Sequence, residues 1–502
     1  MINPPIDLRK PPARTPSSPS EHHCMTAQAS LMWFRQDLRL RDNPALTAAA
    51  NSGPILPVYI LDDTNSAPWQ LGAASRWWLH QSLNALNMQL NNRLMVLRGD
   101  PRKLIPALAA DYGIEKIFWN RCYEPWRSQR DSELKQTLKD SGLSVSSSNA
   151  SLLIEPWLNL KDDGTPYKVF TPFYKKAMSK GIALDPVLSA EPAPEFIPAE
   201  LPANRLDTLE LMPAVEWHSG FAKIFTPGEA GAEQQLARFL EHGISNYQKG
   251  RDFPALESVS RLSPHIHFGE IAPHRIYKES LEFGRLKGIE SESEHFGREL
   301  VWREFSYSLL HYFPSLPENN MNRTFDHFPW QQDKSLLHSW QTGQTVYPLV
   351  DAGMRELWQT GYMHNRIRMV VGSFLVKNLM QDWREGARWF WDCLVDADLA
   401  SNTASWQWVA GCGADAAPYF RIFNPISQSE RFKAAPYIRR FVPELAQLDD
   451  KHIHEPSAAP ELILAAAGVQ LGVNYPEPVV GLKASREKAL EAYQQLKARN
   501  QA

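Results

Sequence analysis

Short apolar runs alternate with amphipathic segments in the first third of the chain. Four runs have the length of buried strands, namely SLMWF, PILPVYILDD, RLMVLRG and KIFWN. The segments SRWWLHQSLNALNMQL and PRKLIPALAADYG lie between them, and their apolar residues recur with the spacing of a helix. This alternation predicts an α/β domain over residues 29–160, built on a doubly wound, Rossmann-like parallel sheet.

Polar residues follow several of the predicted strands directly. They include Arg35 with Asp37, Asp62 with Asp63, and residues 120–124. Sheets of this class bind ligands beyond the carboxyl ends of their strands, so these side chains are candidates for a ligand site. The alternative is that they only close the edge of the sheet.

Helical periodicity dominates from residue 231 to the end, which predicts a large all-α domain over residues 231–502. Proline punctuates residues 161–230, so we expect an extended linker between the two domains. Residues 1–28 are rich in Pro and Ser and lack periodicity, which predicts a disordered extension. The helical segments are GAEQQLARFLEHGISNYQ, APHRIYKESLEFGRL, EHFGRELVWREFSYSLLHYF, LVDAGMRELWQTGYMHNRIRMVVGSFLVKNLM, WREGARWFWDCLV and ASREKALEAYQQLKARN.

Composition narrows the class of protein. The net charge of −3 gives no global attraction for nucleic acid, so any contact with DNA must come from a local basic face. The four cysteines form no CxxC pair, and we expect reduced thiols, with no disulfide framework and no metal site. No apolar run is long enough to span a membrane. We therefore expect a cytoplasmic, monomeric protein without a membrane partner.

Residues 383–425 combine acids, amides and tryptophans in a way that core segments rarely do. Asp396 and Asp398 precede Asn402, and Trp406 and Trp408 follow. A buried Trp needs a partner for its N–H and a buried Asp needs a cation, so a large planar cofactor with polar edges would satisfy both. Asn402 is suited to hydrogen-bond a ring nitrogen whose protonation changes, and the alternative is that it caps the helix that follows. Trp406 and Trp408 should point in opposite directions on that helix.

Two further segments place polar residues on one helical face. In GYMHNRIRMVVGSF, the residues Asn365, Arg368 and Met369 share a face, and the alternative is a salt bridge between helices. In FGRELVWREF, Glu299 and Trp302 share a face. A carboxyl group can read the hydrogen-bonding edge of thymine and Trp can stack on its ring, whereas the alternative pairs Glu299 with Arg303.

A candidate phosphate site precedes another predicted helix. Hydroxyl groups and backbone N–H groups at the start of a helix bind phosphate, although the same residues also serve as ordinary helix caps. The residues concerned are Tyr247, Ser260, Arg261, Leu262 and Ser263.

These motifs resemble, in order, the photolyase/cryptochrome family, and specifically photolyases that repair cyclobutane pyrimidine dimers. LMWFRQDLRLRDNPAL and RDFPALESVSRLSPHIHFGE add to the resemblance, which runs from about residue 30 to about residue 480. It implies bound FAD, in contact with Tyr247, Ser260, Arg261, Leu262, Ser263, Arg303, Arg368, Asp396, Asp398 and Asn402. It places around the pyrimidine dimer Glu299, Trp302, Asn365, Met369 and Trp408.

The resemblance also implies an electron relay and a DNA-binding rim. The relay consists of Trp406, Trp383 and Trp330, with Trp389 and Trp391 as nearby alternatives, although core packing is the ordinary role of Trp. The rim contacts UV-damaged DNA through Arg251, Arg366, Arg421, Gln428 and Arg431.

The segments GAASRWWLHQSL and FWNRCYEPWRSQRD resemble the class III branch of these photolyases. That branch implies a methenyltetrahydrofolate antenna in the N-terminal domain, and the alternatives are 8-hydroxy-deazaflavin or no antenna. Where many folate-binding relatives carry an Asn-Glu pair, this chain has Trp126 and Arg127.

The function that the resemblance implies is light-driven repair of cyclobutane pyrimidine dimers by single-electron transfer from photoexcited, reduced FAD. One alternative is a cryptochrome-type blue-light photoreceptor, which shares the fold and the cofactor. The other is a (6-4) photolyase, whose chemistry uses a histidine at the position of Asn365. His364 is adjacent, but we expect it to point away from the lesion pocket.

Overall fold

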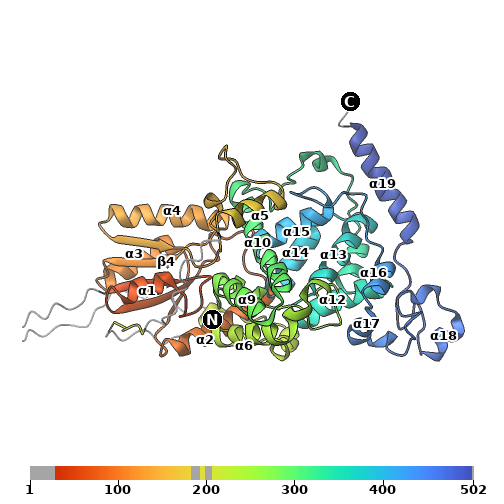
Figure 1. The fold of residues 1–502 in the computed structure, drawn as a ribbon, viewed down its shortest axis with the longest axis horizontal. Coiled ribbons are helices and arrows are strands. Elements are labelled where there is room, and N and C mark those ends of the chain that lie inside the picture. Colours follow the sequence, from red (N-terminus) through yellow and green to blue (C-terminus); the bar gives the residue numbers. More distant parts are fainter. Residues whose placement is uncertain (1–28, 182–192, 198–205, 500–502) are drawn as a thin grey trace, which may run out of the picture.

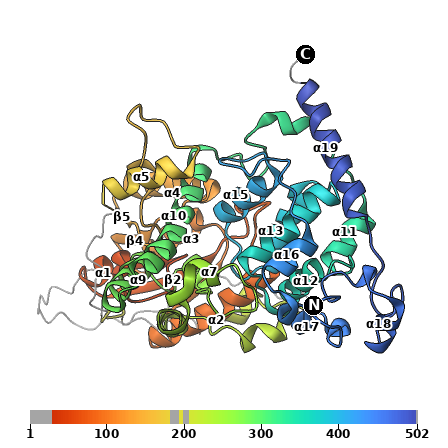
Figure 2. The same ribbon diagram turned by 45° about the vertical axis from the view of Figure 1, so that its right-hand side comes forward.

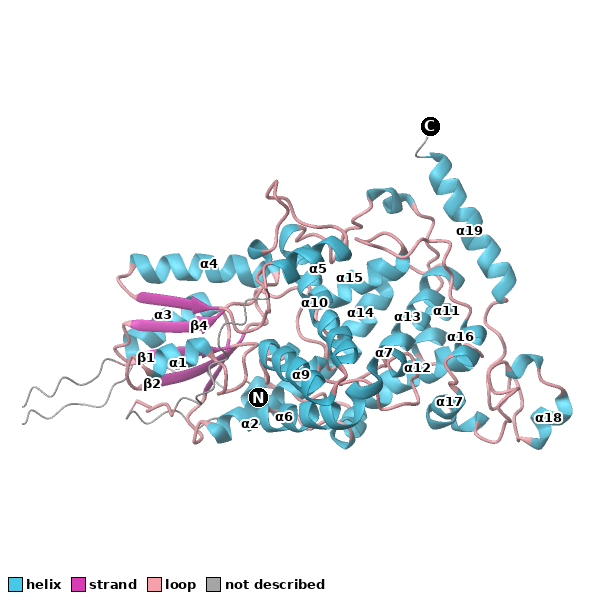
Figure 3. Ribbon diagram, in the orientation of Figure 1, coloured by secondary structure: helices cyan, strands magenta, loops and turns pink. Residues whose placement is uncertain are grey.

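The computed structural model describes residues 29–181, 193–197 and 206–499. The α/β part lies at one end of the molecule and the helical part makes up the rest (Figures 1 and 3). The extension predicted for residues 1–28 lies outside the described residues. The strands are β1 (Ser30–Phe34), β2 (Ile55–Leu61), β3 (Met95–Arg98), β4 (Lys116–Asn120) and β5 (Ser144–Ser148).

All five strands are parallel and lie in the order β3-β2-β1-β4-β5. The winding reverses between β1 and β4, which confirms the doubly wound class and marks the place where such sheets bind ligands. Every residue of β1 is buried, as a parallel sheet covered on both faces requires. The surrounding helices are α1 (Pro44–Ala50), α2 (Ala73–Gln89), α3 (Pro101–Asp111) and α4 (Pro125–Asp140).

Alternate residues of β1 belong to different hydrophobic clusters. Met32 and Phe34 pack with α1 and α2, whereas Leu31 and Trp33 pack with α3 and α4. This two-residue period is what a strand imposes on its side chains. The sequence analysis missed β5 because its sequence, SVSSS, contains a single apolar residue.

The helical part matches the predicted segments closely, with one exception. The helix predicted over residues 349–380 is interrupted, because Gly361 adopts the left-handed conformation (φ 67°) and ends α12. His364 caps the next helix, which continues into a π-helical turn, η7 (Phe374–Asn378). The helices are α5 (Phe170–Ser179), α6 (Glu229–Arg238), α7 (Tyr247–Gly250), α8 (Ser263–His267), α9 (Pro273–Lys287), α10 (Glu290–Tyr312), α11 (Lys334–Gln341), α12 (Pro348–Thr360), α13 (Asn365–Ser373), α14 (Trp383–Cys393), α15 (Leu399–Ala410), α16 (Pro425–Arg431), α17 (Ala435–Phe441), α18 (Glu461–Ala466) and α19 (Leu482–Arg499).

The largest hydrophobic cluster lies among α12, α13, α14, α15 and the C-terminal helices. Within this group, α12 packs on α13 and α16, and Figure 2 shows the three close together. Three of its tryptophans, Trp340, Trp383 and Trp406, are almost completely buried. Cys122, Cys393 and Cys412 are buried free thiols, and Cys24 lies outside the described residues. Within the described ranges, no helix combines the length and the apolar character needed to cross a membrane.

The α/β part docks on the helical part through α2. The backbone is so close at Gly72 that an added Cβ would lie 2.2 Å from the carbonyl oxygen of Trp391. Ser75 donates a hydrogen bond to the carbonyl oxygen of Leu394, and the indole N–H of Trp78 donates to the Glu270 carboxylate. This contact brings the carboxyl ends of β1 and β2 next to α14 and α15.

Candidate cofactor and substrate site

Asp396 joins three motifs that are far apart in the sequence. Its two carboxylate oxygens accept hydrogen bonds from Nη2 of Arg368 at 3.0 and 2.8 Å. The hydroxyl of Ser263 donates to the same carboxylate at 2.6 Å. Arg368 is fixed in turn by a 2.7 Å hydrogen bond from its Nε to the carbonyl oxygen of Met363. The buried negative charge is therefore paired, as a buried carboxylate requires.

A second cation, Arg261, lies next to this pair. It adopts the left-handed conformation, with φ of 51°. The guanidinium groups of Arg261 and Arg368 lie 5.6 and 5.3 Å from the same ring, that of Tyr362. Two cations and the Ser263 hydroxyl at the start of α8 form a suitable site for a diphosphate.

The other residues of this candidate phosphate site have mainly packing contacts. Leu262 is fully buried, and its N–H lies 3.4 Å from the Ser260 hydroxyl oxygen. Tyr247 is buried against Phe239 and Phe296, and burial raises the pKa of its hydroxyl above the ordinary value. These residues hold the loop that presents Arg261.

The start of α15 corrects one prediction. Asp398, not Asn402, caps this helix, because its side chain accepts the backbone N–H of Ser401 at 2.8 Å. Asn402 lies within the helix and donates from Nδ2 to the carbonyl oxygen of Ala387 at 3.0 Å. The amide oxygen of Asn402 has no hydrogen-bond donor among the described residues. It is available to a ligand at this position.

Asp398 is held by other side chains of the fold. It accepts a hydrogen bond from the hydroxyl of Tyr307, and Nδ1 of His267 lies 3.6 Å from the carboxylate. Burial opposes its charge, but His267, Arg303 and Tyr307 outweigh burial and keep the pKa of Asp398 well below its usual value. Arg303 stacks over the ring of Tyr307 and donates to the carbonyl oxygen of Ser151 at 2.8 Å. Arg303 therefore links α10 to the loop that follows β5.

The residues expected around a lesion lie on α10 and α13. Glu299 forms an ion pair with Arg251, with Nη1 to Oε1 at 2.5 Å, and so the alternative pairing with Arg303 is wrong. Trp302 stacks on Phe170, with ring centroids 3.6 Å apart and nearly parallel planes. The sequence analysis did not identify Phe170, which belongs to the linker segment.

Asn365 is exposed at the start of α13, and Met369 is half-buried. Arg366 lies beside Met369, with Nη1 3.7 Å from the thioether sulfur, and also pairs with Asp252. Because Arg251 and Asp252 are neighbours, they link Glu299 on α10 with Arg366 on α13. Sequence analysis missed Asp252, which carries no motif of its own. The structure thus brings together the lesion residues of two separate helices.

The tryptophans of the predicted relay have different environments. The Trp406 ring lies edge-on to Phe390 at 5.0 Å and to Trp340 at 6.2 Å, and its indole N–H is buried without a partner among the described residues. Trp383 is fully buried and donates to the Asn320 side chain at 2.8 Å. Trp330 is half-buried, with its ring 4.3 Å from that of Phe328. Trp408 is half-buried, unlike Trp406.

The predicted rim residues come from three places: Arg251 follows α7, Arg366 lies in α13, and the others lie before or within α16. Arg421 and Arg431 are exposed and Gln428 is half-exposed. Arg431 stacks over the ring of Phe432 at 5.4 Å, and Arg366 stacks over the same ring at 4.8 Å. Through Arg366, Arg431 is thus connected to Met369.

A separate hollow, part of it open to solvent, lies beyond the carboxyl ends of β1 and β2. Aromatic and charged residues line it, and α14 and α15 contribute one wall. Glu124 and Arg127 form an ion pair there, with Nε to Oε1 at 3.5 Å, and Oε2 of Glu124 is buried without a hydrogen-bond partner among the described residues. The lining includes Trp33, Arg35, Tyr59, Asp62, Asp63, Trp69, Glu124, Trp126, Arg127, Arg130, His267 and Trp391.

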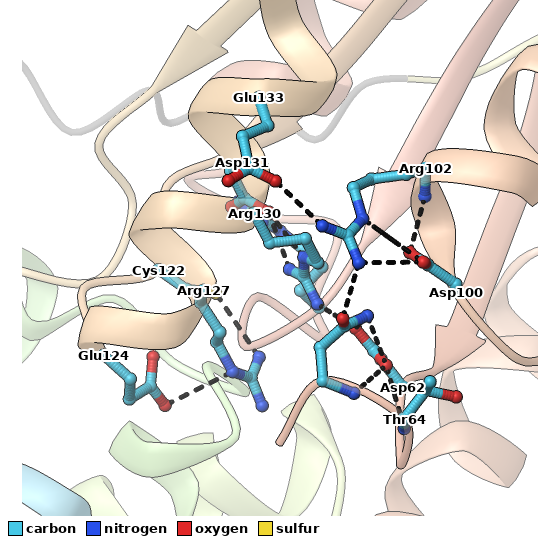
Figure 4. A network of polar contacts seen from close by, with 12 residues as sticks. Asp62, Thr64, Asp100, Arg102, Cys122, Glu124, Arg127, Arg130, Asp131 and Glu133 are labelled. Atoms are coloured by element: carbon cyan, nitrogen blue, oxygen red, sulfur yellow. Dashed lines mark hydrogen bonds and ion pairs between the residues drawn. The ribbon is translucent and has the colours of Figure 1, made fainter. Parts of the chain in front are cut away.

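A network of ion pairs next to this hollow holds its charged side chains in place (Figure 4). Arg130 bridges Asp62 at 2.7 Å and Asp131 at 2.6 Å, and all three side chains are nearly buried. Arg35 also pairs with Asp131. The polar residues that follow separate strands therefore meet at one edge of the sheet, where they support an aromatic hollow.

Comparison with known proteins agrees with this geometry. Residues 30–196 match the family described as DNA photolyase, and residues 296–495 match the FAD binding domain of DNA photolyase. The chain is 46% identical over 478 residues to a deoxyribodipyrimidine photo-lyase of Agrobacterium fabrum, covering 93% of this chain and 98% of that protein. It is 36% identical over 492 residues to cryptochrome-1 of Arabidopsis thaliana, covering 94% of this chain and 71% of that protein.

A solved structure of a bacterial class III photolyase from Agrobacterium tumefaciens has the same fold. It superimposes with a TM-score of 0.90 at 45% identity, over 94% of this chain and 98% of that one. The motifs, the fold and these similarities lead to one conclusion: the chain belongs to the photolyase/cryptochrome family.

Proposed function

We propose that this protein repairs cyclobutane pyrimidine dimers in UV-damaged DNA, using light and FAD. The observation that carries the proposal is the meeting of Arg368, Asp396 and Ser263 next to the lesion residues of α10 and α13. Such a cluster supplies paired charges and directed hydrogen bonds to a large polar cofactor. The similarity to deoxyribodipyrimidine photo-lyases supports the same reaction.

The donor set fits a flavin dinucleotide. Arg261, Ser260 and Ser263 would hold the diphosphate, with Tyr247 and Leu262 packing behind them. Asp396, neutralised by Arg368, and the free amide oxygen of Asn402 would bind the polar edge of the ring. Arg303 and Asp398 hold α10 and α15 in place around it. The chemistry supplied by bound, fully reduced FAD is a light-driven one-electron transfer that opens the cyclobutane ring and is then reversed.

The lesion residues bind and orient the dimer. Glu299, held by Arg251, accepts hydrogen bonds from the N3–H groups of the two bases, and Asn365 hydrogen-bonds their polar edge. Trp302 and Trp408 provide apolar walls, and Met369 fills the floor between them. A dimer that is already poorly stacked leaves the duplex at low cost, so this pocket selects the lesion over normal bases.

The remaining proposed roles concern electron supply and DNA. Trp406 and Trp383, which are buried, and Trp330, which is half-buried, are the proposed path by which the cofactor is reduced. DNA phosphates bind at the rim without reading sequence. We propose a cytoplasmic monomer with domains at residues 29–160 and 231–502, the linker at 161–230. The rim residues are Arg251, Arg366, Arg421, Gln428 and Arg431.

For the hollow of the α/β domain we propose a methenyltetrahydrofolate antenna, which absorbs light and passes on its energy. Trp33, Trp69 and Trp126 suit a flat bicyclic ring, and the Glu124–Arg127 pair suits its polar edge and its carboxylates. Extraction of the bound chromophore from the purified protein tests this choice. An 8-hydroxy-deazaflavin in the extract would replace it.

The function is tested with purified protein, FAD, a reductant and near-UV or blue light. Oligonucleotides that contain a cyclobutane dimer should be restored in the light and unchanged in the dark. Repair of (6-4) photoproducts alone would contradict the proposal and indicate the other photolyase class. A photoreducible flavin without any repair would also contradict it and indicate a photoreceptor.

A further inference from the structure

Lys377 has an unusual position for a lysine. Its side chain is fully buried in η7, and its ammonium donates a hydrogen bond to the backbone carbonyl oxygen of Arg421 at 2.7 Å. No carboxylate of the described residues lies within ion-pair distance of it. Burial first, and then the charge of Arg421, lower the pKa of Lys377 to about 7. A buried, unpaired ammonium is unfavourable for folding, so stability does not explain this residue.

The segment that Lys377 holds is 418–424, the last part of the connection between α15 and α16. Ser373, four residues before Lys377, accepts the backbone N–H of Phe423 at 3.2 Å. The ring of Tyr419, within the segment, is buried 5.4 Å from the Lys377 ammonium. The backbone is therefore fastened to one continuous helical stretch at Arg421 and Phe423, and the Tyr419 ring anchors the segment before Arg421. Single π-helical turns such as η7 occur often at functional sites.

Some side chains of the same segment face solvent, whereas the Tyr419 ring is buried. Arg421 is exposed, and the side chain of Phe420 is 63% exposed. The segment is thus anchored through its backbone from inside and presents these side chains outside. This is the arrangement expected where a cation must stand in a fixed position to meet a partner on the surface.

The charges point to an anionic partner. The Lys377 ammonium contacts the carbonyl oxygen of Arg421 and the ring of Tyr419, and the charge of the Arg421 side chain helps to lower the pKa of Lys377. The positive charges of Lys377 and Arg421 therefore repel each other, and neither forms an ion pair with a carboxylate of the described residues. A phosphate bound by Arg421 would relieve their repulsion.

We propose that Lys377 is a positioning residue for DNA: it holds segment 418–424 from inside so that Arg421 meets a backbone phosphate. The inference rests on the proposed function, because that function makes DNA the partner of this surface. Lys377 itself does not touch DNA. The buried amine of Lys377 therefore serves DNA binding and does not stabilise the fold.

A double-mutant cycle tests the inference. The variants are Lys377→Met, Arg421→Ala and the double substitution, with Lys139→Met, a substitution of an exposed lysine on α4, as the control. DNA affinity is measured in the dark by fluorescence anisotropy at several salt concentrations, on normal and dimer-containing duplexes. Bound flavin absorbance and thermal unfolding are recorded for each variant.

Each single variant should lose about tenfold in affinity for both duplexes, and the salt dependence should fall by about one phosphate contact. The double variant should lose no more than Arg421→Ala alone, because Lys377 acts through Arg421. The melting temperature of Lys377→Met should equal or exceed that of the wild type, with flavin retained. Ser373→Ala removes the hydrogen bond that anchors the backbone N–H of Phe423. It should also weaken DNA binding, and it disturbs the protein interior less than Lys377→Met does.

Several outcomes would overturn the inference. Losses that multiply in the double variant would show that Lys377 acts independently of Arg421. An unchanged affinity in Lys377→Met would also overturn the inference. So would an affinity loss that occurs only together with a lower melting temperature and loss of flavin, because it would show a structural role. Because binding is measured in the dark, a failure of repair in the wild type would refute the proposed function and leave this test intact.

Discussion

Replacing Gly386 with alanine tests whether Trp406 occupies the rigid position that an electron relay requires. Gly386 lies in the middle of α14, and a Cβ added there would lie 2.1 Å from a carbon of the Trp406 ring. Normal carbon contacts are about 3.5–4.0 Å, so the ring or the helix must move by more than 1 Å. The ring cannot turn freely, since Phe390 and Trp340 pack edge-on against it.

The expected magnitude follows from two opposing effects. Overpacking a rigid core typically lowers the unfolding free energy by at most about 3 kcal/mol. Replacing glycine with alanine inside a helix raises the unfolding free energy by about 1 kcal/mol. The net loss of about 2 kcal/mol lowers the melting temperature by about 4–8 °C for a domain of this size. Photoreduction of the bound flavin should be slower because Trp406 is displaced.

The assay combines thermal unfolding with the rate of flavin photoreduction at fixed reductant concentration. Gly481→Ala is the matched control, because an added Cβ there meets nothing within 4 Å. It should leave both quantities unchanged. An unchanged melting temperature and photoreduction rate in Gly386→Ala would refute the packing of Trp406 described above.

Three further predictions concern the site. Glu299→Ala should lower repair efficiency by about 10- to 100-fold, because a charged hydrogen-bond acceptor for the lesion is lost. Its flavin retention should equal that of the control Glu279→Ala, which breaks the ion pair with Arg275 on α9. Equal losses of repair and flavin would show a structural role. Asp396→Asn leaves Arg368 without its anion and should cost about 2–4 kcal/mol of unfolding free energy together with loss of bound flavin. As a control, Glu257→Gln, which breaks an exposed ion pair with Arg238, should cost under about 1 kcal/mol. Burial and the nearby Arg261, Arg366 and Arg368 lower the pKa of His364 from 6.5 to about 3. As the pH falls, His364 is therefore protonated in the unfolded chain before it is protonated in the folded protein. As the pH falls from 6.5 to about 3, the wild type should therefore lose up to about 5 kcal/mol of unfolding free energy relative to His364→Asn, measured by urea unfolding. Equal pH dependence of the unfolding free energy in the two proteins would contradict the lowered pKa.

The sequence predicted the helices of the site well, and for a clear reason. α14 is strongly amphipathic, so its 3.6-residue period marks it directly. The predicted helix over residues 349–380 was wrong in its middle, because periodicity continues through Gly361 although the backbone turns there. β5 was missed because it is a polar edge strand.

The pairings within the site were harder to predict because they join distant parts of the chain. Glu299 pairs with Arg251, 48 residues away, and Ser263 reaches Asp396 across 133 residues. The family resemblance implied that Arg368 and Asp396 both contact FAD, and the structure pairs the two side chains. Helix propensity made Asn402 a plausible cap, but Asp398 precedes it and takes that position. Lys377 carries no motif, so only its burial reveals it.

The measurement that tests the central claim most directly is repair of a single defined thymine dimer in a synthetic duplex by the FAD-loaded, reduced protein. We predict that blue light restores the two thymines over many turnovers per protein molecule. The same mixture kept in the dark should leave the dimer intact, and the flavin should end in its initial redox state. A dimer that survives prolonged illumination with intact reduced flavin bound would contradict the account.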